Sequence, residues 1–154
     1  MDPLVIARYP GMDALRRRRA ELFESTAALD EALCAPASAS LATWTERLDV
    51  ALGELMADIY AHIAITEGPY GLHADVIATA PRLANAVQRL ACEHAEITEL
   101  IDRMRARTHG VSSPDHVAQL RARGTDLLAR LSKHRQRGAD LVFEAYETDI
   151  GGET

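Results

Sequence analysis

Aromatic residues and cysteines are scarce in this chain. Among its 154 residues, Phe, Trp and Tyr together make up 5%, and the cysteines are Cys34 and Cys92. Two cysteines are too few for a disulfide framework and are typical of a reducing compartment, so we expect a cytoplasmic protein. Few aromatics, beside abundant Ala, Leu, Arg and Glu, favour helices over sheets.

Other familiar signals are missing as well. No apolar run is long enough to span a membrane, and the first residues lack the charged start and long apolar core of a secretory signal. The formal net charge of −6 does not favour nucleic acid. The chain has no nucleophile elbow, phosphate-binding glycine loop or zinc-type cysteine pair. We therefore expect neither a membrane nor a nucleic-acid partner, and the oligomeric state stays open.

Four amphipathic segments account for most of the chain. The predicted helices run from about Met12 to Leu33, from Ser40 to Glu67, from Thr79 to Gly110, and from Ser113 to about Asp149. Ser40 suits an N-cap, Pro81 suits a first helical turn, and Gly110 suits a left-handed closing residue. Residues 68–78 have an apolar group of their own and can hold a short helical turn. The expected fold is a single all-α domain over residues 1–154, an up-down-up-down four-helix bundle.

Three histidines lie in the apolar stripes of three successive predicted helices. They are His62, His94 and His134. Each is three or four residues from apolar neighbours; His94, for example, lies four residues after Leu90 and three before Ile97. Spacings that alternate between three and four place side chains on the face that a bundle buries. A buried imidazole needs a hydrogen bond or a metal ion. Three of them on three helices predict a site between the helices.

Carboxylates and a hydroxyl near these histidines extend the candidate site. Imidazole, carboxylate and water are suitable ligands for iron, manganese or zinc. Asp58 lies four residues before His62 on the same face, and Thr66 lies one turn after it. The candidate metal ligands are His62, Glu67, Glu93, His94 and His134. The candidate pocket residues are Asp58, Thr66, Arg18, Arg19 and Gly138.

The two arginines and the glycine each allow more than one interpretation. Either Arg18 or Arg19 must approach the apolar stripe of the first helix, where it buries its stem and keeps its head in water, or closes the pocket. Gly138 lies one turn past His134, where it leaves room for a small ligand or serves simply in packing. The remaining histidines fall at loops or helix ends and are expected in solvent: His73, His109 and His116.

In these motifs the chain resembles the hemerythrin-like (HHE) family of helical bundles. The resemblance spans roughly residues 44–146. It rests on His62-Ile-Ala-Ile-Thr-Glu67, on Glu93-His94 and on Leu131-Ser-Lys-His134. It implies a bundle in which histidines and carboxylates from four helices hold a pair of non-haem irons. Such sites bind oxygen or serve in iron, redox or nitric-oxide biology.

The ligand pattern that the resemblance implies is incomplete here. The first helix has no histidine, and Thr98 stands where oxygen carriers have a second histidine on the third helix. Gly138 and Ala139 replace the fourth-helix carboxylate, and Thr66 replaces the second-helix one. What remains suffices for one metal ion, with mononuclear iron favoured over a dinuclear site, or for none.

Three functions stay open at this stage. The first is a reduced metal site whose open positions bind oxygen, nitric oxide, peroxide or another small molecule. The second is a metal-free bundle that acts as a ligand-binding or protein-interaction module. The third is an enzyme whose small substrate enters past Arg18 or Arg19.

The heights of the three histidines in the bundle are a separate question. If the helix ends were level, a rise of 1.5 Å per residue would offset His62 from His94 by roughly 12 Å, and His94 from His134 by roughly 7–8 Å.

Overall fold

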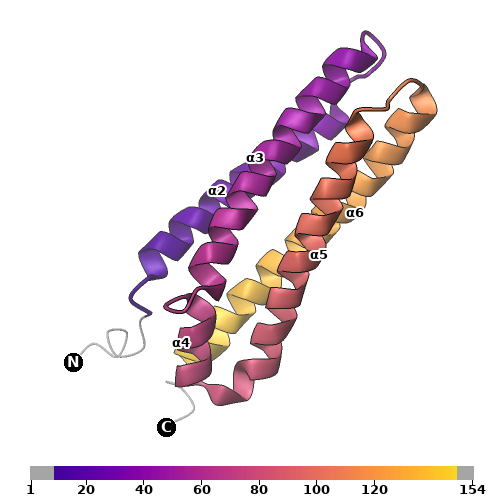
Figure 1. Cartoon of the computed structure of the whole chain (residues 1–154). Coiled ribbons are helices and arrows are strands. Elements are labelled where there is room, and N and C mark those ends of the chain that lie inside the picture. Colours follow the sequence, from indigo (N-terminus) through magenta and orange to yellow (C-terminus); the bar gives the residue numbers. More distant parts are fainter. Residues whose placement is uncertain (1–8, 149–154) are drawn as a thin grey trace.

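The computed structural model describes residues 9–148, and the regular structure within them is helical. The four long helices are α2 (Met12–Cys34), α3 (Leu41–Glu67), α5 (Ala84–Thr108) and α6 (Pro114–Phe143). They run up, down, up and down, and each packs against two neighbours in the cyclic order α2, α3, α5, α6 (Figure 1). The predicted four-helix bundle is confirmed. The expected end of the last helix at Asp149, and the outer parts of the expected domain 1–154, lie outside the described residues.

The helix ends follow the sequence signals at some positions and not at others. The hydroxyl of Ser40 accepts a hydrogen bond from the Thr43 N–H at 3.2 Å, which confirms the predicted N-cap of α3. Gly110 does not close α5 in a left-handed conformation, because no described glycine has a positive φ. Its N–H instead donates to the Arg107 carbonyl at 3.4 Å, so a tighter turn closes the helix.

The connection between α3 and α5 contains the short helix α4 (Leu72–Thr79), which confirms the predicted helical turn. Leu72 and Val76 on α4 are buried, so α4 covers the lower end of the bundle in Figure 1. A 3₁₀ turn, Pro81–Leu83, then leads into α5. A π-helical turn, Glu144–Thr148, continues α6, and the Tyr146 hydroxyl in it donates to Asp75 of α4. This hydrogen bond ties α4 to the end of α6.

The interior holds two apolar clusters. The larger cluster includes Trp44, Leu48, Leu52, Leu55, Ile59, Ile97, Ile101, Met104, Leu127 and Leu131. The smaller cluster lies against α4 and includes Leu15, Leu72, Val76, Leu83, Val87, Leu90 and Leu141. Each long helix has apolar residues in or packed against both clusters, and each has a polar side chain at the level between them. These four side chains, called the polar layer below, are Arg19, His62, His94 and His134.

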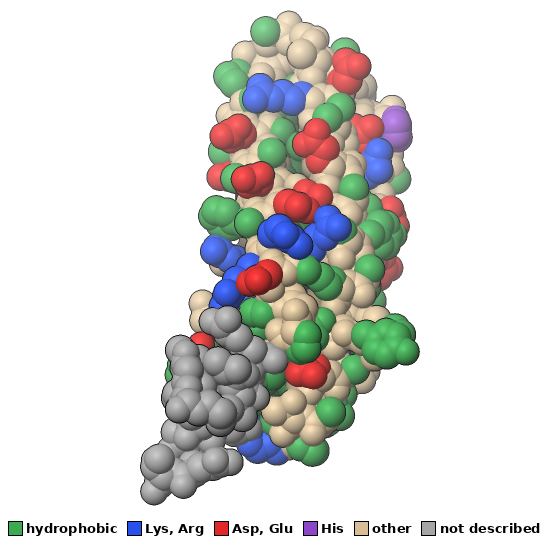
Figure 2. Space-filling model, turned by 90° about the vertical axis from the view of Figure 1, so that its left-hand side faces the viewer, with side chains coloured by type: hydrophobic (Ala, Val, Ile, Leu, Met, Phe, Trp, Pro, Cys, Tyr) green, Lys and Arg blue, Asp and Glu red, His purple; other side chains and the backbone are tan. Residues whose placement is uncertain are grey.

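The outer surface contrasts with this ordered interior. Acidic and basic side chains are interspersed over the face shown in Figure 2, without a continuous area of one sign. None of the helices within residues 9–148 combines the length and the apolar character that crossing a membrane requires.

Candidate metal centre

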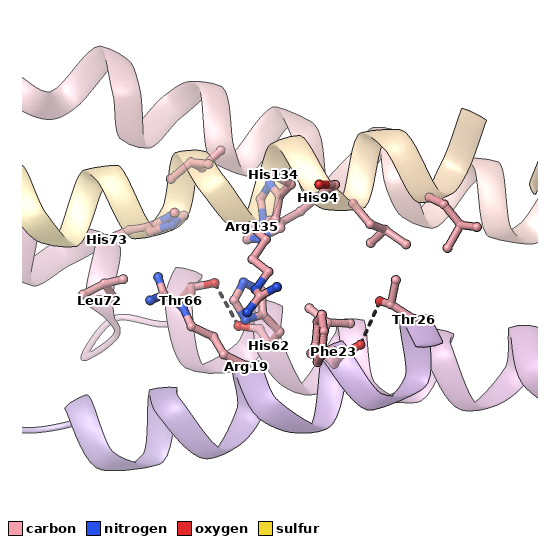
Figure 3. A pocket seen from close by; sticks show the side chains of 16 residues that line it. Arg19, Phe23, Thr26, His62, Thr66, Leu72, His73, His94, His134 and Arg135 are labelled. Atoms are coloured by element: carbon pink, nitrogen blue, oxygen red, sulfur yellow. Dashed lines mark hydrogen bonds between the residues drawn. The ribbon is translucent and has the colours of Figure 1, made fainter. Parts of the chain in front are cut away.

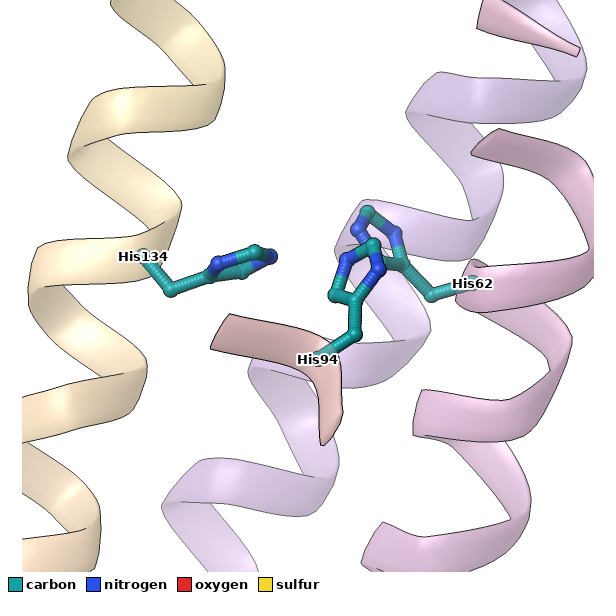
Figure 4. Close-up of side chains that lie close together, drawn as sticks. All are labelled: His62, His94 and His134. Carbon is teal, nitrogen blue, oxygen red and sulfur yellow. The ribbon is translucent and has the colours of Figure 1, made fainter. Parts of the chain in front are cut away.

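His62, His94 and His134 come together in the polar layer (Figure 4). Each offers a ring nitrogen, and the three nitrogens lie within 4.8 Å of one another. The ring centroids are 4.6 to 5.9 Å apart, and each residue is at most 6% exposed. The predicted offsets in height do not arise because the helix ends are not level: α5 extends past the end of α3, and α4 fills the difference (Figure 1).

Glu67 and Glu93 lie behind the histidines and are not among the clustered donor atoms. The Nδ1–H of His94 donates to Glu67 Oε2 at 2.6 Å, and the Nδ1–H of His134 donates to Glu93 Oε1 at 2.9 Å. In this arrangement the two carboxylates accept hydrogen bonds from the histidines, and their role as oxygen ligands stays a prediction. A carboxylate only accepts, so Nδ1 of each ring carries the proton and Nε2 keeps a free lone pair. Carboxylates commonly orient metal-binding histidines in this way.

Two ring nitrogens of the cluster have no hydrogen-bond partner among the described residues. They are Nδ1 of His62 and Nε2 of His94, and both are buried. A buried polar atom without a partner costs about 1–3 kcal/mol. The free energy lost by burying these two nitrogens would be recovered if they bound a metal ion or a hydrogen-bonding ligand.

Burial keeps the imidazoles neutral. Burial above all, then His94, His134 and Arg19, lowers the pKa of His62 to about 3. Burial likewise lowers the pKa of His94, and the nearby His134 and His73 rings add to this effect. For His134 burial lowers the pKa, while its hydrogen bond to Glu93 opposes the shift. Neutral imidazole is the form that ligates metal ions, so the rings are ready to bind one near neutral pH.

Helix α2 contributes Arg19 to the polar layer, at the position where the hemerythrin resemblance implies a histidine. Arg19 is half-buried and makes no hydrogen bond or ion pair with any described residue. Burial, followed by repulsion from Arg135 and Arg16, lowers its pKa. Arg18 is exposed and pairs with Glu21 at 3.0 Å, so Arg19 is the arginine that reaches the pocket.

A cavity of about 120 Å³ opens beside the histidines (Figure 3). Gly138 lies in its wall, and a Cβ built there would be 3.2 Å from Nη2 of Arg19. The glycine therefore gives space to the guanidinium. The lining residues are Arg19, Leu22, Phe23, Thr26, His62, Thr66, Leu72, His73, Leu90, His94, Leu128, Leu131, Ser132, His134, Arg135 and Gly138.

Of the two candidates near His62, Asp58 lies outside the cavity wall and Thr66 lies in it, as predicted. Asp58 does not line the cavity, because it turns toward α2 and accepts a hydrogen bond from Ser25. Thr66 does line it, but its hydroxyl donates to the backbone carbonyl of His62 at 2.8 Å. The hydroxyl proton of Thr66 is thus engaged by the backbone of α3.

The sequence interpretation missed the two ionisable cavity residues His73 and Arg135. His73 was expected in solvent, but it is 7% exposed, and its ring is stacked on that of His94 with centroids 5.9 Å apart. Leu72 and Val76 are four residues apart, and this spacing within residues 68–78 was the available signal for a buried helix face. Arg135 directly follows His134 and so lies about 100° from it around the helix, outside the apolar stripe that the sequence pattern identifies.

Comparisons of the chain with models of protein families, with curated proteins and with solved structures find no match.

Proposed function

We propose that His62, His94 and His134 bind a single transition-metal ion in a hemerythrin-like bundle. The observation that carries this proposal is the pair of buried nitrogens without partners, within a cluster of three donors. Imidazole suits iron, zinc, copper and nickel. The resemblance to hemerythrin-like proteins makes iron our first choice.

The donor set supports one ion rather than two. Dinuclear carboxylate sites need several oxygen ligands from the helices. Here Glu67 and Glu93 are engaged by His94 and His134, and α2 supplies the cation Arg19 instead of a ligand. The residues present therefore fit a mononuclear site and do not fit a pair of irons.

An ion held by three protein donors keeps at least one position for an outside ligand. A metal ion bound by the three histidines would act as a Lewis acid and, if it is iron, as a redox centre. The cavity beside the histidines gives a small molecule a place at that position. The proposed function is thus the binding or conversion of a small ligand, such as a diatomic molecule or peroxide, at a buried metal.

A metal-free bundle that binds a small molecule is the second candidate. The observation in its favour is that, in the described part of the chain, no carboxylate joins the clustered histidine nitrogens to balance a metal's charge. In that case the histidines and the cavity bind the ligand directly. The metal content of the protein separates the two candidates.

The test is elemental analysis of protein purified without a histidine tag or added metal. About one metal per chain is expected, and His94→Ala is expected to lose it while keeping its helicity. His109→Ala is the matched control, because His109 is exposed at the far end of the same helix. Retention of metal by folded His94→Ala, or no metal in the unmodified protein, would reject the metal proposal in favour of the second candidate.

A further inference from the structure

The cavity beside the histidines is unbalanced in charge. Among residues 9–148, its lining contains Arg19 and Arg135 but no aspartate and no glutamate. The nearby carboxylates of Glu67 and Glu93 are occupied by histidine Nδ1 atoms and do not line it. Within the described chain, nothing in the cavity wall neutralises these two cations.

Arg19 is held with its charged end toward this space. It comes from α2 and is half-buried, and no described residue donates to it or accepts from it. The absence of a side chain at Gly138 leaves room for its guanidinium. A buried charge without a counter-ion is costly, because its desolvation is not offset by an ion pair. An anion in the cavity would remove this cost.

Arg135 reaches the same space from α6 (Figure 3). Arg135 is exposed, and its guanidinium carbon lies 4.2 Å from the centroid of the Phe23 ring, in a cation–π contact at the cavity. Arginine offers a planar set of donors that matches a carboxylate. Arg19 and Arg135 therefore present two such donor groups at one cavity.

The rest of the wall is largely apolar. The apolar side chains that contribute are Leu22, Phe23, Leu72, Leu90, Leu128 and Leu131. The volume of about 120 Å³ is close to the roughly 150 Å³ of an apolar cavity that admits benzene. A ligand that suits both parts has one anionic end and a small apolar body.

We propose that this cavity binds a small organic carboxylate, with its anionic end at the Arg19 guanidinium and its apolar body against the leucine wall. The inference rests on the proposed function in one respect: a metal ion at the histidines would give the carboxylate a second contact. The contact with Arg19 does not depend on the metal.

The experiment measures binding of benzoate and of its neutral analogue benzamide by isothermal titration calorimetry, on metal-free and metal-loaded protein. Benzoate is expected to bind at least about tenfold more tightly than benzamide, as a charge-assisted hydrogen bond predicts. Arg19→Gln is expected to weaken benzoate binding about tenfold or more. Arg18→Gln is the matched control, since Arg18 is the exposed neighbour of Arg19 and pairs with Glu21. Circular dichroism checks that each variant folds.

Equal binding of benzoate and benzamide, no benzoate binding, or unchanged binding by folded Arg19→Gln would overturn the proposal. Arg19→Lys, which keeps the charge, gives a second reading: partial rescue supports an anion at this position, and no difference from Arg19→Gln contradicts it. The metal-free protein gives the Arg19 result even if no metal is ever taken up. Failure of the carboxylate proposal is thus distinguishable from failure of the metal proposal.

Discussion

Leu52 and His62 lie ten residues apart on α3, and both are buried in the same bundle. Leu52 belongs to the larger apolar cluster, where the interior is filled by hydrocarbon. His62 belongs to the polar layer, where the interior holds unpaired nitrogen atoms and a cavity. One helix therefore contributes apolar packing at one level and an unpaired polar atom at another, and burying that atom is costly.

The largest expected effect is the difference in unfolding free energy between substitutions at Leu52 and at His62 in the metal-free protein. Leu52→Ala is expected to lower the free energy of unfolding by about 2–5 kcal/mol, because it leaves a cavity in a packed core. His62→Leu is expected not to lower it, because the change removes a buried nitrogen without a partner. Urea denaturation of both variants measures the difference. A loss at His62 as large as that at Leu52 would mean that the imidazole is a satisfied part of the core.

Acid should act on the polar layer of the metal-free protein. The unfolded chain binds a proton at His62 near pH 6.5, whereas the folded protein does so only near pH 3. Between these values the unfolded state holds more protons, so stability falls as pH falls, by up to about 1.4 kcal/mol per pH unit for each such histidine. As far as His62 is concerned, the folded protein therefore has its full stability above pH 6.5, and the loss is complete by about pH 3.

The measurement is urea unfolding between pH 6.5 and pH 4. His62→Leu should lose less stability than the unmodified protein over this range, and exposed His109→Ala should follow the unmodified protein. Parallel pH curves for His62→Leu and the unmodified protein would contradict the lowered pKa of His62.

The smallest effect concerns two glycines of α6, one in each region. A Cβ at Gly124 would collide with the Leu33 side chain in the larger cluster, whereas at Gly138 it would meet only the end of Arg19. Gly124→Ala should lower the free energy of unfolding by about 1–2 kcal/mol, as overpacking outweighs the gain in helix propensity. Gly138→Ala should raise it by up to about 1 kcal/mol. Thermal denaturation compares them, and equal shifts would show that the two regions are packed alike.

The fold could be predicted from the sequence because its signals are local. Apolar residues recur at spacings of three and four, and residues such as Ser40 and Pro114 mark where helices begin. The same periodicity identified the three histidines as interior residues. Gly110 shows the limit: its type suggested a left-handed closing residue, but a tighter turn satisfied the helix end first.

The details of the site depend on contacts between helices, which the sequence does not contain. Glu67 and Glu93 could be placed near the histidines, but their role as acceptors from Nδ1 depends on how α3, α5 and α6 face one another. The choice between Arg18 and Arg19 depends on the rotation of α2 by one residue. The burial of His73 depends on where α4 packs: the spacing of Leu72 and Val76 indicates a buried helix face but not which part of the bundle that face covers.

X-ray absorption spectroscopy at the edge of the bound metal tests the central claim most directly. It counts the donors around the ion and detects a second metal close by. Three imidazole nitrogens from His62, His94 and His134 around one ion, with no neighbouring metal, is the result that we predict. A second metal near the first, or fewer than three imidazoles, would contradict a single ion held by the polar layer.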